Sequence, residues 1–200
     1  MATAHHAPTT FAELLWPAQG ASRALRAVLL ALLGSALLTI SAKIEVPFYP
    51  VPMTMQTLVV LLLGMAYGAR LGTATVLLYL AEGAAGLPVF AGTPERGIGI
   101  AYMLGPTGGY LAGFVLSAAI TGWLTERRRD WPALVLAVTA GSIVVFIPGV
   151  LWLAQLIGFE QSIANGLMPF LWATLVKGAI AIALGMAGAA LIQKRLADQT

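Results

Sequence analysis

The sequence predicts an all-α integral membrane protein whose chain crosses a lipid bilayer six times. Of its 200 residues, 59% are hydrophobic and only 10% are charged, and the mean hydropathy is +0.87. An ordinary soluble domain carries about 25% charged residues, so a soluble fold is excluded. The long apolar stretches are counted instead as crossings of a hydrocarbon core about 30 Å thick, and about six fit into this length.

The first crossing is expected at residues 25–41. Prolines at positions 47, 50 and 52 follow it. Since proline fixes its own backbone and restricts the residue before it, residues 43–52 are expected to form a stiff extended loop.

Two short crossings are expected within residues 54–81, where the only charge is Arg70 between Gly68 and Gly72. These glycines predict a tight turn between two helices that are each close to the lower length limit for a span. A re-entrant hairpin is the alternative, but it would leave Arg70 deep in the membrane, where a charge is costly.

The second half of the chain predicts a long loop and three more crossings. Residues 83–103 contain five glycines and two prolines, which is too broken a pattern for a helix. Pro106 suits the first turn of a helix, and Pro148 predicts a kink in a later one. The remaining crossings are expected at residues 106–124, 133–157 and 169–192.

The basic residues predict the orientation of the chain. Lys43 and Arg96 lie on one set of faces and Lys177 lies within a helix, whereas the other eight of the 11 basic residues share the faces of the two termini. Because cytoplasmic loops are enriched in lysine and arginine, both termini are expected to be cytoplasmic. These eight residues are Arg23, Arg26, Arg70, Arg127, Arg128, Arg129, Lys194 and Arg195.

The expected organisation is a cytoplasmic N-terminal segment (1–22), a membrane domain (23–195) and a short cytoplasmic tail (196–200). The first segment lacks the basic start and clean apolar centre of a signal peptide. Its residues 11–16 form either a short amphipathic stretch on the membrane surface or a frayed terminus.

Several function classes are excluded by absent motifs. The sequence has no P-loop, no H-E-x-x-H and no G-x-S-x-G, so it offers no ATPase, no metallohydrolase site and no serine nucleophile. It contains no cysteine, and its two histidines, His5 and His6, have no acidic residue nearby, so no metal or cofactor is expected. Without a basic face interleaved with aromatic residues, nucleic acid is not an expected partner either.

Polar residues gather near the outer ends of the predicted helices and indicate one outward-facing cavity. Gln56, Tyr79, Glu82 and Trp152 all lie in this zone. Lys177 follows Pro169 by eight residues, about 12 Å along a helix, and so falls in the outer half of the membrane. Ionisable residues there usually face the bundle interior and mark a ligand route. The alternatives for Lys177 are snorkelling to the surface or pairing with Glu82, and the aromatic residues could instead form an interfacial belt.

A row of small residues on the first helix is the second signal. Ala27, Ala31 and Ser35 recur every four residues and would let another helix approach closely. That helix could belong to a partner protein or to this chain itself.

Three motifs, in this order, resemble one transporter family. They are Pro47-Phe-Tyr-Pro-Val-Pro-Met-Thr-Met-Gln-Thr57, Gly86-Leu-Pro-Val-Phe-Ala-Gly92 and Leu104-Gly-Pro-Thr-Gly-Gly-Tyr-Leu-Ala-Gly-Phe114. The chain resembles, over roughly residues 25–193, the BioY family of biotin-specific substrate-binding S components of energy-coupling-factor (ECF) transporters.

The resemblance implies a six-helix S-component bundle in the bacterial cytoplasmic (inner) membrane. It would capture biotin with high affinity from the extracellular or periplasmic side. Transport in this family is usually energised by a transmembrane coupling (T) protein and two cytoplasmic ATPase subunits, although some members work without them. The small residues Ala27, Ala31 and Ser35 would then form a docking surface for the coupling protein.

One position departs from the family pattern. An aspartate commonly stands three residues before the lysine, whereas Thr174 stands three residues before Lys177 here. Threonine can still hydrogen-bond a ureido group, and Glu82 is an alternative acid.

Biotin's chemistry suggests how the expected site divides. Its rings need apolar walls such as Phe90 and Tyr79, its ureido group needs Gln56 and Thr174, and its carboxylate needs Lys177 or Arg96. Glycines allow the backbone to approach a ligand closely. The full set of expected ligand-binding residues is Thr54, Gln56, Tyr79, Glu82, Phe90, Arg96, Gly108, Gly109, Trp152, Thr174 and Lys177.

Other functions remain open at this point. A solitary facilitator or channel, a structural membrane subunit and a carrier of another vitamin-like anion are the alternatives. A channel should carry polar residues through the full membrane depth. The inner halves of these helices are almost entirely Leu, Ala, Val and Gly, which favours binding from one side.

Overall fold

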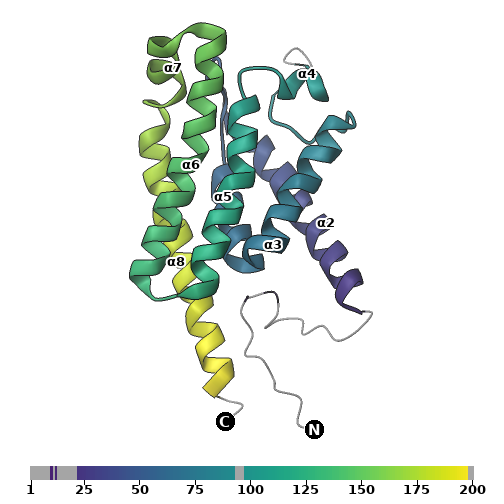
Figure 1. The fold of residues 1–200 in the computed structure, drawn as a ribbon, viewed down its shortest axis with the longest axis vertical. Coiled ribbons are helices and arrows are strands. Elements are labelled where there is room, and N and C mark those ends of the chain that lie inside the picture. The colour runs from purple at the N-terminus through teal and green to yellow at the C-terminus, as the bar shows by residue number, and fades with distance from the viewer. Residues whose placement is uncertain (1–9, 11, 13–21, 93–96, 198–200) are drawn as a thin grey trace.

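A computed structural model gives the fold and describes residues 10, 12, 22–92 and 97–197. Its long helices run roughly along the longest axis of the molecule (Figure 1). In chain order the elements are α2 (Ser22–Lys43), β1 (Glu45–Val46), β2 (Met53–Thr54), α3 (Gln56–Ala84), α4 (Ile100–Met103), α5 (Gly108–Arg127), α6 (Trp131–Ile157), α7 (Phe159–Gly166) and α8 (Phe170–Ala197).

Five of the described helices are long and apolar enough to cross a membrane, whereas six crossings are expected, because two of the expected crossings fall within α3. Large apolar side chains cover their outer faces; Leu25 of α2, Leu136 of α6 and Leu175 of α8 are each about 60% exposed. Such a surface suits a lipid environment. The five candidate spans are Arg23–Lys43, Gln56–Ala84, Gly108–Arg127, Trp131–Ile157 and Phe170–Lys194.

The helix α3 is bent back on itself at Gly68, inside the segment where the sequence predicts a tight turn. Gly68 has φ 80° and ψ 177°, a conformation open to glycine but strained for other residues. A Cβ atom added to Gly72 in the second arm would lie 3.1 Å from the main-chain oxygen of Leu63 in the first arm. The two arms of α3, residues 56–67 and 69–84, therefore lie side by side.

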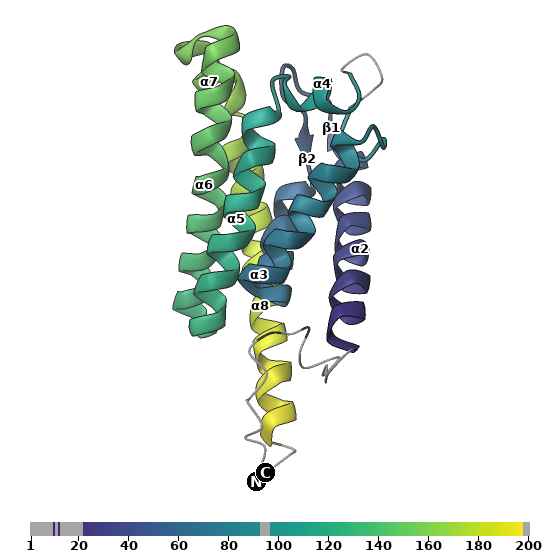
Figure 2. The ribbon, with the colours of Figure 1, turned by 45° about the vertical axis from the view of Figure 1, so that its right-hand side comes forward.

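The helices α3, α5 and α6 form a tightly packed centre. A Cβ atom on Gly64 of α3 would touch the backbone of α5 near Ala118 and Gly122. On the other side of α5, a Cβ atom on Gly113 would lie 2.7 Å from the main-chain oxygen of Val145 in α6. Small residues at these crossings allow the backbones to approach closely, as in other membrane bundles. Helix α2 packs on α3 at one side of this centre (Figure 2), and α8 packs against both α3 and α6.

One local expectation is wrong, and two further features were not expected. The segment 83–103 is not free of helix, because α3 continues to Ala84 and a single turn, α4, forms at Ile100–Met103. The helix α7 was not expected. Its eight residues lie in the connection between the last two predicted crossings and are too few to span a membrane. The expected extended loop at residues 43–52 does form, but it includes β1, which pairs antiparallel with β2 so that Glu45 lies opposite Thr54. The amphipathic stretch expected at residues 11–16 lies outside the described residues, apart from Ala12.

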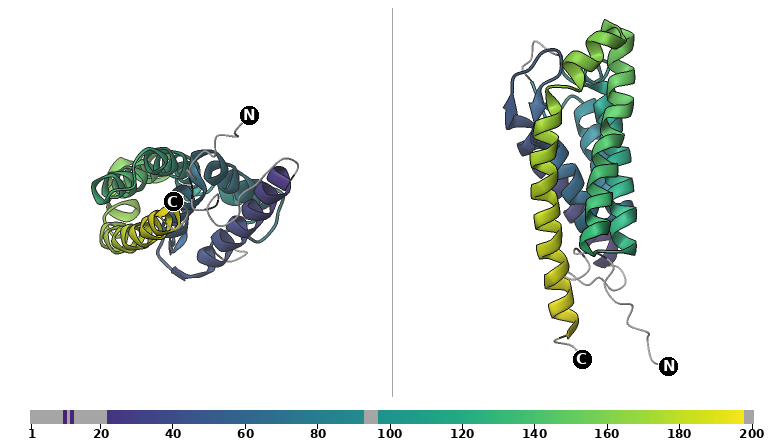
Figure 3. Two further views of the ribbon diagram at one scale, coloured as in Figure 1. Left: turned by 90° about the horizontal axis from the view of Figure 1, so that it is seen from below. Right: turned by 90° about the vertical axis from the view of Figure 1, so that its left-hand side faces the viewer.

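The start of α2, the end of α8 and the α5–α6 connection lie at one end of the molecule, whereas α4, α7 and the β-hairpin lie at the other (Figures 1 and 3). The turn of α3 also reaches the first end, because the amide of Ala69 donates to Oε1 of Glu126 at 3.0 Å. Most of the arginines are therefore at the same end of the molecule as the start of α2 and the end of α8.

Candidate functional site

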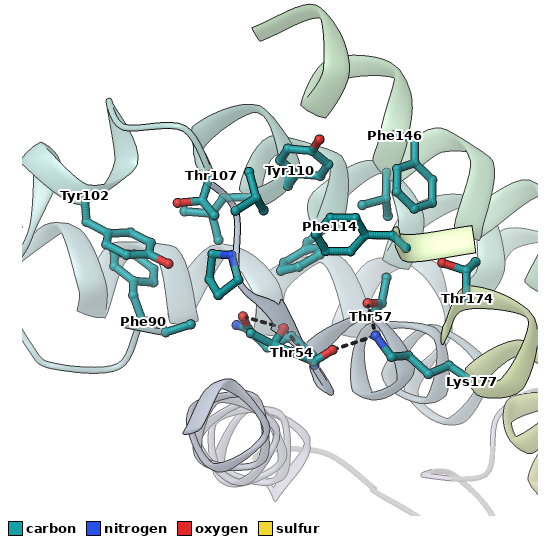
Figure 4. A pocket seen from close by; sticks show the side chains of 17 residues that line it. Thr54, Thr57, Phe90, Tyr102, Thr107, Tyr110, Phe114, Phe146, Thr174 and Lys177 are labelled. Carbon is teal, nitrogen blue, oxygen red and sulfur yellow. Dashed lines mark hydrogen bonds between the residues drawn. The ribbon is translucent and has the colours of Figure 1, made fainter. Parts of the chain in front are cut away.

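A cavity opens between α3, α5, α6 and α8, in the half of the molecule that carries the β-hairpin. About 570 Å³ of atom-free space lies in it, including open space at its mouth. In Figure 4, Phe90 and Tyr102 lie at one end of it and Thr174 and Lys177 at the other. The lining residues are Val51, Pro52, Thr54, Gln56, Thr57, Phe90, Ala91, Tyr102, Thr107, Tyr110, Leu111, Phe114, Val145, Phe146, Phe170, Thr174 and Lys177.

Lys177 provides the positive charge of this cavity. Its side chain is only 8% exposed, and its ammonium donates to the main-chain oxygen of Thr54 at 2.6 Å and to Oγ1 of Thr57 at 3.5 Å. Both acceptors are neutral, and among the described residues no carboxylate pairs with Lys177. Since a buried charge is costly unless it is paired, an anion that enters the cavity would be attracted to this end.

A chain of hydrogen bonds begins next to Lys177 and runs behind the cavity wall. Thr54 Oγ1 donates to Oε1 of Gln56 at 3.2 Å, and Nε2 of Gln56 donates to the hydroxyl of Tyr79 at 2.7 Å. The Tyr79 hydroxyl in turn donates to the main-chain oxygen of Val89 at 3.1 Å. Gln56 lines the cavity. Tyr79 is fully buried behind Phe90 and supports the Phe90 ring.

Aromatic rings form the end of the cavity that is opposite Lys177. The ring of Phe90 stacks on Tyr102, with centroids 5.0 Å apart, and meets the edge of Tyr79 at 5.4 Å. Its position depends on Gly83, because a Cβ atom there would overlap the Phe90 ring. Flat apolar walls of this kind suit a ring system.

The long wall between the two ends consists of residues that the sequence analysis did not select. Tyr110 is fixed by donating its hydroxyl hydrogen to the main-chain oxygen of Gly166 at 2.8 Å, and its ring meets Phe146 edge-on. Phe146 also packs against Phe170. Phe114 lies one helical turn after Tyr110, a spacing that places both on one face of α5 and was available in the sequence.

Five expected ligand residues, Thr54, Gln56, Phe90, Thr174 and Lys177, do line the cavity. Trp152 does not line it and instead donates its indole hydrogen to the main-chain oxygen of Gly105 at 2.9 Å. Gly108 and Gly109 permit close helix contacts: a Cβ atom on Gly109 would overlap the backbone of Pro148 in α6. Arg96 lies outside the described residues.

Glu82 also lies away from the cavity, and it does not replace the acid missing from position 174. Its Oε2 accepts a hydrogen bond from the hydroxyl of Ser35 in α2. Ser35 and Ala31 are buried, 1% and 9% exposed, on the side of α2 that faces α3. Only Ala27 of the small-residue row is half-buried, so in this conformation the row packs largely within the chain itself.

The chain matches a known protein family over most of its length. Residues 12–194 match the model of the BioY family. The chain belongs to the BioY family. The match covers the cavity, the β-hairpin and every helix around them.

Individual BioY relatives extend over most of the chain. It is 38% identical over 147 residues to the probable biotin transporter BioY of Pyrococcus horikoshii, which covers 74% of this chain and 86% of that protein. It is 35% identical over 153 residues to the biotin transporter BioY of Thermotoga maritima, with 76% and 89% covered.

A solved structure matches the fold. The chain superimposes on the crystal structure of the S-component for biotin from an ECF-type ABC transporter with a TM-score of 0.72, over 85% of this chain and 94% of that one. At 24% sequence identity, this likeness establishes the arrangement of the helices.

Proposed function

We propose that this BioY protein captures biotin from outside the cell and serves as the S component for its uptake across the bacterial cytoplasmic membrane. The observation that carries the proposal is the buried ammonium of Lys177, which has only neutral partners and lies at one end of an aromatic cavity. Biotin combines a carboxylate with an apolar ring system, and relatives that match most of the chain are named biotin transporters.

The cavity residues divide according to the parts of the ligand. Lys177 would receive the carboxylate through a charge-assisted hydrogen bond. Phe90 and Tyr102 would stack on the fused rings, and Gln56 would offer both a donor and an acceptor to the ureido group. Another vitamin-like anion of similar shape would satisfy the same groups. Biotin is proposed because the relatives that match most of the chain are named biotin transporters.

Both arms of α3 are proposed as crossings, which makes six in total. The arms are only about 18 and 24 Å long at 1.5 Å per residue, yet the turn between them reaches Glu126 at the far end of α5. Arg70 then lies at the membrane surface rather than within the core. The excess of arginine at this end makes it cytoplasmic, so both termini are cytoplasmic and the cavity opens outward.

Energy for uptake would come from other subunits. The sequence lacks a P-loop, so a coupling protein and two ATPase subunits are the proposed partners. The polar cavity residues are gathered in one half of the molecule, which favours capture from one side over a continuous channel.

Isothermal titration of the detergent-purified chain with biotin tests the proposal. We expect saturable biotin binding at one site per chain. A neutral sugar of similar mass should not bind. Lys177→Met should weaken binding, whereas Lys194→Met, which removes an exposed lysine at the other end of α8, should not. Absence of biotin binding to the parent protein would refute the proposed function.

A further inference from the structure

A short wall segment of the cavity, residues 86–92, is bounded by two glycines with left-handed backbone. Gly86 has φ 94° and Gly92 has φ 103°. Between them, Phe90 and Ala91 line the cavity. Glycine adopts such conformations without strain, and the contacts that the rest of the segment makes then fix its position.

On the cavity side, α3 holds this wall segment. The hydroxyl of Tyr79 donates to the main-chain oxygen of Val89, and the Phe90 ring packs between Tyr79 and Tyr102. These contacts come from residues that belong to the site already described.

From the other side, α2 holds the same segment through Lys43. The Lys43 ammonium donates to the main-chain oxygen of Phe90 at 2.6 Å. Lys43 is the last residue of α2, and none of the described residues of α2 lines the cavity. A second contact, from Ser35 to Glu82, joins α2 to the arm of α3 that leads into this segment.

We infer that Lys43 is a positioning residue for ligand retention: its hydrogen bond to Phe90 holds residues 86–92 against the cavity and makes the closure of this wall depend on the placement of α2. The inference rests on the proposed function and names a residue that does not line the cavity. Because the contact holds this wall against a bound ligand, its loss should affect dissociation more than association.

The test compares the dissociation rate of labelled biotin, chased with unlabelled biotin, across four purified proteins. Lys43→Met should release biotin roughly five- to tenfold faster than the parent, as expected for loss of one partly exposed charge-assisted hydrogen bond. Lys43→Arg keeps a cationic donor and should stay within about twofold. The matched control Lys194→Met should release biotin at the parent rate.

Amide hydrogen exchange without ligand provides a second measurement. In Lys43→Met, residues 86–92 should exchange faster, while the α5–α6 core and the melting temperature stay at parent values. If biotin leaves Lys43→Met at the parent rate, or leaves Lys43→Arg as fast as Lys43→Met, the inference is wrong. If the parent does not bind biotin at all, the proposed function fails, and unchanged exchange in residues 86–92 would separately overturn the role of Lys43.

Discussion

The ammonium of Lys177 in α8 lies 2.6 Å from the main-chain oxygen of Thr54, 123 positions earlier in the chain. This hydrogen bond joins the last long helix to the strand that precedes α3. It also holds the charged end of the cavity in place, because it fixes the ammonium itself. The residues of α8 that line the cavity are Phe170, Thr174 and Lys177. A ligand anion at this position would join the two sides of the cavity.

Gln56→Ala should weaken biotin binding less than removal of Lys177. A neutral hydrogen bond contributes about 0.5–1.5 kcal/mol, so we expect a loss of roughly two- to tenfold in affinity by titration calorimetry. Asn165→Ala is the matched control, because that amide bonds to Gln161 within α7, away from the cavity. Equal affinities for the parent and Gln56→Ala would remove Gln56 from the site.

Gly83→Ala should displace Phe90, since a Cβ atom at this position overlaps the Phe90 ring. Overpacking of this kind costs about 1–3 kcal/mol, and we expect biotin affinity to fall by roughly tenfold. In Gly178→Ala the new Cβ atom would lie 3.4 Å from Val138, an ordinary contact, so that variant should bind like the parent. Identical affinities for the two variants would contradict the assigned position of Phe90.

Tryptophan substitutions along α2 should separate internal packing from partner docking. Ala31→Trp adds volume to a buried contact with α3 and should lower the melting temperature. Ala27→Trp should leave folding and biotin binding intact but prevent co-purification with a coupling protein, because close helix approach tolerates little added volume. The control is Leu33→Trp, at a position 55% exposed. Normal assembly of Ala27→Trp would end the docking proposal.

Single cysteines on this cysteine-free chain can measure its orientation. A membrane-impermeant thiol reagent applied to intact cells should label Tyr49→Cys, near the β-hairpin and 86% exposed, but not Arg128→Cys in the α5–α6 connection. The reason is the excess of arginine at the α5–α6 end. Labelling of residue 128 alone before lysis would reverse the proposed orientation.

The long helices were predictable because apolar length is a property of the local sequence. The bend of α3 was predictable as well, since Gly68 and Arg70 interrupt an otherwise apolar run. In contrast, α7 has only eight residues and α4 four, and neither carries an apolar stretch long enough to stand out from the connections around it. Their helical form depends on packing at the end of the bundle.

The site was predictable where a polar residue stands out in an apolar helix, as Lys177 and Gln56 do. The aromatic wall was not, because Phe146 in a membrane helix looks the same in sequence whether it faces lipid, core or ligand. Glu82 shows the opposite difficulty. Its partner Ser35 lies 47 positions away on another helix, and only the packing of α2 on α3 brings the two together.

The most direct test of the central claim is a comparison of biotin with its neutral amide on the parent protein and on Lys177→Met. If Lys177 receives the carboxylate, the mutation should cost about 1.5–3 kcal/mol, or roughly ten- to a hundredfold and more, for biotin. The amide should bind weakly to the parent and lose little more on mutation. An equal loss for both ligands, or no loss for either, would contradict the claim that the buried ammonium of Lys177 recognises the anionic end of the ligand.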